Sequence, residues 1–158
     1  MSLLKKLSLL VVCMGVFLIT GCGGKVENIE GTLEELMTSV YSGLSDEQKP
    51  MMLMNTEVNE ENIEYYLGAS DIEYEEALAS ESAVGSIAHS VVLVRVKDNA
   101  NIENIKTKIK DNVDPRKWIC VGVEAENVIV ENRGNLIILI MVEDQTTRDT
   151  LKKGFENL

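Results

Sequence analysis

Three cysteines, one histidine and 26 acidic residues are the groups of this chain that are most able to do chemistry. Only Cys22 lies in a recognisable sequence motif. It follows the pair Thr20-Gly21, and the apolar residues 7–19 lie before that pair, behind the basic pair Lys5-Lys6. A basic start, a short apolar stretch and small residues before a cleavage point are the parts of a secretory signal peptide. The thiol of Cys22 is therefore the first candidate reactive group.

The segment Leu18-Ile19-Thr20-Gly21-Cys22 resembles the lipobox of bacterial lipoprotein signal peptides. The resemblance implies a diacylglyceryl thioether on Cys22, cleavage between Gly21 and Cys22, and a mature chain held at the extracytoplasmic face of the cell membrane. The competing interpretations are a transmembrane helix and a non-lipidated secretory signal that is cleaved elsewhere. A helix that spans a membrane needs about 20 apolar residues, which is more than this stretch offers. We therefore expect residues 1–21 to be a lipoprotein signal peptide.

The charge of the chain limits its partners. Removal of residues 1–21, which hold Lys5, Lys6 and no acid, would leave 137 residues and change the formal net charge from −11 to −13. Nucleic-acid binding is not expected, because phosphate contacts need clustered Lys and Arg. Anionic head groups would not attract this chain either. The membrane contact should come from the lipid on Cys22, because two acyl chains anchor a protein stably.

Cysteine chemistry in the mature chain is sparse. Cys13 leaves with the signal peptide and Cys22 carries the lipid, so Cys120 is left without an intramolecular disulfide partner. A redox-active or nucleophilic thiol is one interpretation of Cys120. The other, which we favour, is a small buried hydrophobic residue, because Cys120 lies between Ile119 and Val121.

The remaining chain has the length of one domain. Residues 22–31 comprise the lipidated cysteine and a short polar leash, which reaches at most about 30 Å at about 3.3 Å per residue. Residues 32–158 are then a single α+β domain. We expect a mostly antiparallel sheet of about four strands packed by three to four helices.

Local signals support these elements. Thr32 and Glu35 fit a capping box at the start of a helix whose apolar stripe runs to Leu44. Further helices are expected at residues 59–67, 101–113 and 147–157. Strands are expected at residues 91–96 and, as a hairpin, at 128–131 and 136–142, the latter buried on both faces. Residues 72–79 fit either a strand or a helix, and residues 45–58 and 80–90 should be irregular.

The order of these parts resembles a family of small Gram-positive bacterial lipoproteins known only as a numbered domain of unknown function. The resemblance rests on Tyr65-Tyr66-Leu67-Gly68, on the strand at residues 91–98 with the basic helix after it, and on Asn132-Arg133-Gly134-Asn135 before the apolar strand. These motifs concern the fold rather than chemistry. The family therefore implies a class and a location, and it brings no catalytic residues.

No catalytic set, cofactor site or metal site is expected from the sequence. His89 has Ser86 and Ser90 nearby, but no nucleophile elbow surrounds either serine, so a structural histidine is the favoured interpretation. Calcium is disfavoured because the spacing of an EF-hand loop is absent. One histidine and one free cysteine cannot build a zinc site by themselves. Trp118 should cap the core beside Ile119.

Three functions remain open at this point. We favour a non-catalytic binding or assembly module with a possible protein partner at the cell envelope. The alternatives are an envelope hydrolase that uses spatially paired carboxylates and a small solute-binding lipoprotein. The hydrolase candidates are Glu73, Glu75, Glu76, Glu124 and Glu126. The stripe from Leu33 to Leu44 and the methionines Met51, Met52 and Met54 are candidate partner surfaces, but packing on the domain and filling gaps under a loop are their favoured roles.

Overall fold

The sheet contains five antiparallel strands in the order β1-β2-β3-β5-β4. The structure is a computed structural model that describes residues 28–158, so the expected signal peptide and Cys22 lie outside the described residues. The α+β class and the antiparallel sheet are confirmed, while the expected strand count of about four was one too low. The strands are β1 (Leu53–Glu57), β2 (Glu76–Ser82), β3 (His89–Arg95), β4 (Ile129–Arg133) and β5 (Leu136–Val142).

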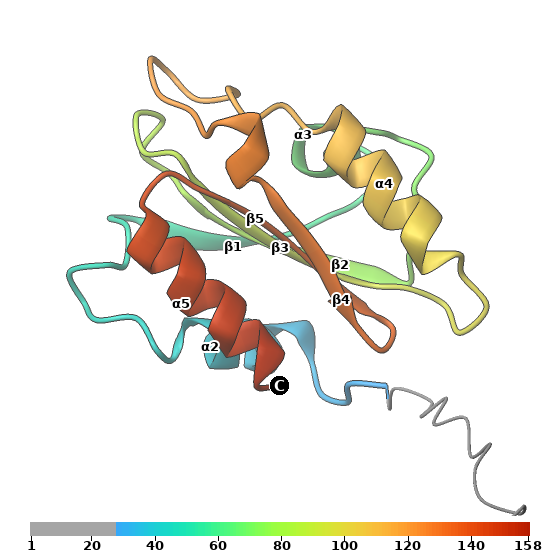
Figure 1. The fold of residues 1–158 in the computed structure, drawn as a ribbon. Coiled ribbons are helices and arrows are strands. Elements are labelled where there is room, and N and C mark those ends of the chain that lie inside the picture. The colour runs from blue at the N-terminus through green and yellow to red at the C-terminus, as the bar shows by residue number, and fades with distance from the viewer. Residues whose placement is uncertain (1–27) are drawn as a thin grey trace, which may run out of the picture.

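Four α-helices cover the two faces of this sheet in the described part of the chain (Figure 1). Each face is covered by two helices, and a 3₁₀ turn, η1 (Ala125–Asn127), lies between the last helix of the second pair and β4 in the chain. The first pair consists of α2 (Leu33–Tyr41) and α5 (Gln145–Glu156), and the second of α3 (Ile63–Leu67) and α4 (Ile102–Asn112).

The core is divided between these two faces by the alternation of side chains along the inner strands. In β3, Val92 and Val94 point to the α3/α4 face, whereas Val91 and Leu93 point to the α2/α5 face. Every residue of β5 is buried, as expected for a strand covered on both faces. Burial of this apolar surface is the main force that holds the two layers of helices against the sheet.

Helix ends and turns form where capping residues and glycines in the sequence predict them. The Thr32 hydroxyl accepts from the Glu35 N–H, and the Glu35 carboxylate accepts from the Thr32 N–H, which confirms the capping box. Gly68 ends α3 with φ of 80° and lies so close to the backbone of Asn112 that a Cβ atom would clash. Gly134 has φ of 56° in the two-residue turn of the β4–β5 hairpin.

The expectation that residues 45–58 are irregular was wrong, because they contain β1. This strand carries no alternating apolar pattern, since only its β2-facing edge is paired and Met54, Asn55 and Glu57 are exposed. The ambiguous residues 72–79 are resolved as the approach to β2 and its first part, and β2 continues to Ser82. The helices expected at 101–113 and 147–157 are confirmed with shifts of one or two residues.

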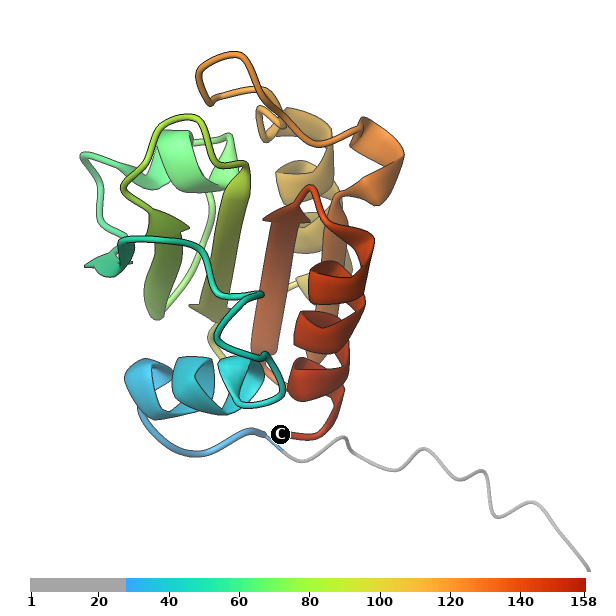
Figure 2. The same ribbon diagram turned by 90° about the vertical axis from the view of Figure 1, so that its left-hand side faces the viewer.

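The sheet has two ends, which differ in what lies there. At one, β2 begins with Glu76 opposite Arg95, the last residue of β3; we name this the Arg95 end. At the other, Glu81 lies opposite Ser90; we name this the Glu81 end. Figure 2 shows the first described residues, in blue, beside the C-terminus at the bottom, and the loop between α4 and β4, in orange, at the top.

Candidate functional site

A buried lysine–glutamate pair lies at the Glu81 end, on the α3/α4 face. The Lys117 ammonium is 2.8 Å from Glu81 Oε2, and the two side chains are only 4% and 12% exposed. Lys117 Nζ is also 3.4 Å from the Ser90 hydroxyl. Removing two charges from water is costly unless they are paired and hydrogen-bonded. This pair therefore requires the side chains around it to supply hydrogen bonds.

Aromatic side chains surround the pair. Tyr65 Oη donates to Glu81 Oε1 at 2.8 Å, and the Trp118 indole N–H donates to the same oxygen at 3.1 Å. The Lys117 ammonium lies 4.1 Å from the ring centroid of Tyr65 and 5.0 Å from that of Tyr66. Tyr65 and Tyr66 themselves meet edge to face. The ammonium is therefore held by one carboxylate and by the faces of aromatic rings, which attract cations.

The environment shifts the acidity of two of these groups. Burial lowers the pKa of Lys117 below its usual range, and the hydrogen bond and charge of Glu81 act in the opposite direction. Burial together with the bond to Glu81 raises the pKa of Tyr65. A protonated phenol therefore lies beside the Lys117–Glu81 salt bridge at neutral pH.

A hollow of about 330 Å³ opens beside this cluster. We name it the aromatic hollow; its lining includes Tyr65, Tyr66, Glu81, Lys117, Trp118 and the side chains of β1 that point to the same face, Met54 and Thr56. The large apolar residues that are exposed in residues 28–158 gather at its rim or just beyond it. Met54, Tyr65 and Ile119 line it, and the backbone carbonyls of Met51 and Met52 accept from the lining residues Ser82 and Ala83; each of these five apolar side chains is at least half exposed.

The loop after α4 brings Lys117, Trp118 and Ile119 to this place. The Ile119 N–H donates to the Gly85 carbonyl at 2.7 Å, which joins the loop to the β2–β3 connection. The Val123 N–H donates to the Pro115 carbonyl at 2.8 Å and closes the loop on itself. Trp118 packs into the core of the α3/α4 face, as expected from the sequence.

Two expectations about single residues were wrong. Cys120 is exposed rather than buried, because the loop turns at this residue with φ of 63° and directs the thiol to solvent. Met51, Met52 and Met54 do not fill gaps under a loop; all three are exposed, and Met54 lines the aromatic hollow. The expected packing of the Leu33–Leu44 stripe on the domain is confirmed, since its apolar residues are buried on the α2/α5 face.

His89 lies on the opposite face from the aromatic hollow. Its Nε2 is 2.8 Å from the Tyr41 hydroxyl, and burial lowers the pKa of His89 from 6.5 to about 4. Ser90 points to the other face, toward Lys117, so the sheet separates these two neighbours. This placement agrees with a structural histidine. A hollow of about 500 Å³ lies beside His89, but its lining comes mainly from loops and lacks the exposed apolar side chains described above.

The acidic residues considered for hydrolysis are not brought together as one set. Glu76 binds Arg95 at the Arg95 end, whereas Glu124 binds Arg116 in the loop beyond α4, near the Glu81 end. The others, Glu73, Glu75 and Glu126, are exposed. Within residues 28–158, no group of three His, Cys, Asp or Glu side chains is placed to hold a metal ion.

Sequence reasoning missed Glu81 and Lys117. Alternation along β2 puts Glu81 on the same face as the core residues Ala77 and Ala79, and a charge at a core position is a signal of a buried partner. That signal needs the strand to extend to Glu81, which the small polar residues around it concealed. No local pattern marks Lys117 as its partner.

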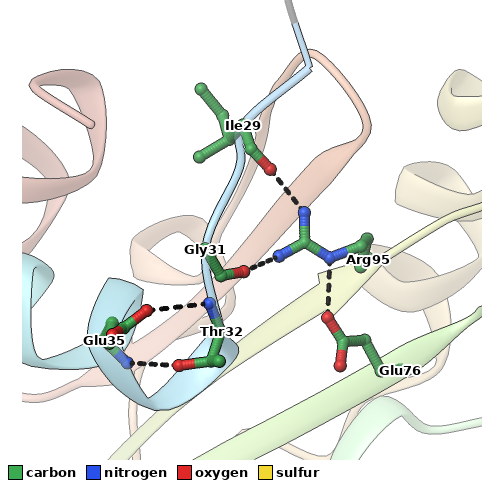
Figure 3. Close-up of polar contacts among 6 residues, drawn as sticks. All are labelled: Ile29, Gly31, Thr32, Glu35, Glu76 and Arg95. Carbon is green, nitrogen blue, oxygen red and sulfur yellow. Dashed lines mark hydrogen bonds and ion pairs between the residues drawn. The ribbon is translucent and has the colours of Figure 1, made fainter.

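A second polar cluster, at the Arg95 end, holds the start of the domain. Arg95 donates to the Ile29 carbonyl at 2.5 Å and to the Gly31 carbonyl at 2.6 Å, and its Nε is 2.7 Å from Glu76 Oε1 (Figure 3). The Thr32 capping box follows directly (Figure 3). The guanidinium thus fixes residues 29–31 to the adjacent ends of β2 and β3 through charge-assisted hydrogen bonds.

Comparison with known proteins gives no further guide to function. No protein-family model, curated protein or solved structure matches this chain. The family resemblance described above therefore stays a prediction. Among residues 28–158, no helix has the length and apolar character needed to cross a membrane.

Proposed function

We propose that this protein is a lipoprotein anchored through Cys22 at the extracytoplasmic face of the cell membrane, and that its domain is a non-catalytic binding module for another component of the cell envelope. One observation carries the binding role. The exposed large apolar side chains of the described residues gather around one hollow, instead of being scattered over the surface. Such gathering marks an interaction site, whereas single exposed apolar residues carry no meaning.

The chemistry of the hollow favours binding over catalysis. The ammonium of Lys117 is held by Glu81 and by aromatic faces, and Glu81 accepts bonds from Lys117, Tyr65 and Trp118. A group that acts on a substrate must be able to exchange a proton or form a bond at its free end. Here these groups bind one another. Their role is to hold the aromatic rings of the hollow in fixed positions.

The position of the leash supports an outward-facing binding surface. The leash enters the domain at Ile29–Gly31, at the Arg95 end, and the aromatic hollow lies at the Glu81 end. Glu81 lies five residue steps along β2 from Glu76, which is about 17 Å at about 3.3 Å per residue. A domain tethered by its Arg95 end would therefore direct the hollow away from the bilayer.

The anchor is tested by replacing Cys22. We expect the Cys22→Ala protein to lose the mass of the lipid and to leave the membrane fraction after extraction. Cys120→Ala is the matched control, because it removes an exposed thiol of the domain and leaves the signal region unchanged. Membrane association and lipid mass that persist in Cys22→Ala would contradict the anchor.

The binding role is tested by crosslinking the full chain in its native membranes, followed by mass spectrometry. We expect crosslinks to an envelope component that are lost in Met54→Asp and Ile119→Asp, whose side chains are exposed at the hollow. Thr146→Asp introduces the same charge at an exposed position of α5 and should keep them. Equal crosslinking in all variants would reject this surface. Hydrolysis of an envelope polymer that one carboxylate substitution abolishes would reject a non-catalytic role.

A further inference from the structure

The backbone of β1 is paired on one side only. The Met52 carbonyl accepts from the Ala83 N–H at 3.0 Å, and the Val58 N–H donates to the Ala77 carbonyl at 2.9 Å. Successive residues of an antiparallel strand direct their backbone groups to opposite sides. The even-numbered residues of β1 therefore face β2, and the odd-numbered residues face outward.

The outward residues are Leu53, Asn55 and Glu57. The Glu57 carbonyl accepts from the Asn62 side chain at 3.0 Å. In the part of the chain that the structure describes, the outward backbone groups of Leu53 and Asn55 have no hydrogen-bond partner. An unpaired row of this kind is a template for another strand.

The other edge strand, β4, is protected differently. Lys106 donates to Asn132 at 3.0 Å, Lys110 donates to the Val128 carbonyl, and Lys152 is 2.5 Å from Glu131. These lysines belong to α4 and α5 and reach over β4, and covering an edge strand with a helix is a common device against pairing with other chains. The segment of β1 from Leu53 to Glu57 contains no lysine or arginine. The two edges thus differ in a way that leaves β1 open.

The charge next to β1 has one sign. Residues 57–76 contain eight acidic side chains and no Lys, Arg or His. Asp71 and Glu76 are paired with Lys108 and Arg95. Glu57, Glu60, Glu61 and Glu64 are exposed near the end of β1, and no ion pair involves them in the described residues. An acidic field of this kind attracts cations and repels anions.

The other end of β1 is apolar. Met51, Met52 and Met54 are exposed there, and Met54 lines the aromatic hollow. Methionine side chains adapt to varied apolar partners. A ligand that follows β1 would therefore meet apolar surface at one end and carboxylates at the other.

We infer that the occupant of this surface is a cationic polypeptide segment in extended conformation, which adds to β1 as a sixth strand, places an apolar side chain in the aromatic hollow and sets Lys or Arg side chains beside Glu57–Glu64. The inference rests on the proposed function and names its ligand class. Main-chain bonds to Leu53 and Asn55 supply affinity that is independent of sequence, while the hollow and the carboxylates select the segment.

The test uses the full chain in detergent and a short synthetic peptide that alternates lysine with valine. Trp118 is the only tryptophan of the chain and lines the hollow, so its emission reports binding. We expect saturable binding that weakens as salt is raised. A peptide with glutamate in place of lysine should not bind.

Variants separate the two parts of the inference. Asn55→Pro removes an outward N–H without removing a bond to β2, because proline is tolerated on the free side of an edge strand. We expect about tenfold weaker binding in Asn55→Pro and no change in Asn55→Ala, which keeps the N–H. Replacing Glu60 and Glu61 with Lys should weaken binding more than Asp149→Lys on α5, whose acidic side chain is exposed on the other face.

Two results would overturn the inference. Equal affinities of Asn55→Pro and Asn55→Ala would reject strand addition, and equal binding of the lysine and glutamate peptides would reject charge selection. If no cationic peptide binds while Met54→Asp still abolishes crosslinks in native membranes, the inference fails and the proposed function stands. If neither effect is seen, both fail.

Discussion

Two buried polar sites lie on opposite faces of the same end of the sheet, and they use different chemistry. Lys117 and Glu81 keep their charges on the α3/α4 face, whereas Tyr41 and His89 form a neutral pair on the α2/α5 face. Adjacent residues of β3 serve the two sites: Ser90 contacts Lys117, and His89 contacts Tyr41. The face with the retained charges is also the face with the exposed apolar rim.

This difference indicates at which of the two sites the orientation of the neighbouring side chains must be fixed. A neutral hydrogen-bonded pair is enough to satisfy buried polar groups, as His89 and Tyr41 do. A buried ion pair often gives no more stability than apolar packing of similar volume, so its use at the aromatic hollow calls for another reason. We attribute it to the fixed orientation that Glu81 imposes on Tyr65 and Trp118 through hydrogen bonds.

The largest expected effect is the loss of one charge from this pair. Glu81→Gln leaves the buried ammonium of Lys117 without a carboxylate, so we expect the free energy of unfolding to fall by about 3–5 kcal/mol. Lys117→Met should cost less, because Glu81 keeps its bonds from Tyr65 and Trp118. Urea unfolding followed by far-ultraviolet circular dichroism measures both.

The double variant Glu81→Gln with Lys117→Met is the control for this experiment. It removes both charges, so it should recover much of the stability that Glu81→Gln loses. Costs that simply add in the double variant would show that the two side chains are not coupled.

The neutral site predicts a dependence on pH. Burial holds the pKa of His89 at about 4, against 6.5 for an unperturbed histidine. Below pH 6.5 the unfolded chain takes up a proton at this residue and the folded chain does not, so stability is lost as the pH falls from 6.5 toward 4. The shift corresponds to about 3 kcal/mol of differential stability.

The measurement is urea unfolding of the native chain and of His89→Gln between pH 7 and pH 4. Carboxylates also titrate in the lower part of this range, so the difference between the two proteins isolates His89. Parallel pH curves for the two proteins would contradict a neutral buried histidine.

The Arg95 end offers a comparison with both sites, because its charged contacts are partly exposed. Arg95→Met removes the donors to the Ile29 and Gly31 carbonyls, and we expect a loss of about 1–2 kcal/mol. Hydrogen exchange at the first turn of α2 should become faster, while exchange in β2 near Glu81 stays unchanged. Arg95→Lys keeps the charge but cannot reproduce the fork of donors. Full protection of this turn in Arg95→Lys would show that charge alone suffices.

Much of the fold could be predicted from the sequence where the spacing of apolar residues agrees with the capping and turn residues beside them. The capping box at Thr32, the glycine after α3 and the apolar run of β5 each determine structure within a few residues. β1 could not be predicted, because an edge strand with one paired side needs no alternating apolar residues. Its presence depends on β2, which supplies its hydrogen bonds.

The candidate site was harder to predict for a similar reason. Glu81 and Lys117 are 36 positions apart, and nothing in the sequence near either residue points to the other. Met51, Met52 and Met54 look the same in sequence whether they fill a gap or stand at a surface. Only the placement of the loop that holds Trp118 and Ile119 decides between these roles.

The smallest expected effect comes from an ion pair on the surface, which sharpens the contrast with Glu81. Lys152 is 2.5 Å from Glu131 on β4, but these side chains are 36% and 38% exposed. Water solvates both groups in the folded and the unfolded chain, so Glu131→Gln should lower the free energy of unfolding by less than about 1 kcal/mol. Urea unfolding at low and high salt measures this effect, and salt should reduce it further. A loss as large as that of Glu81→Gln would mean that burial is not what separates the two lysine–glutamate pairs.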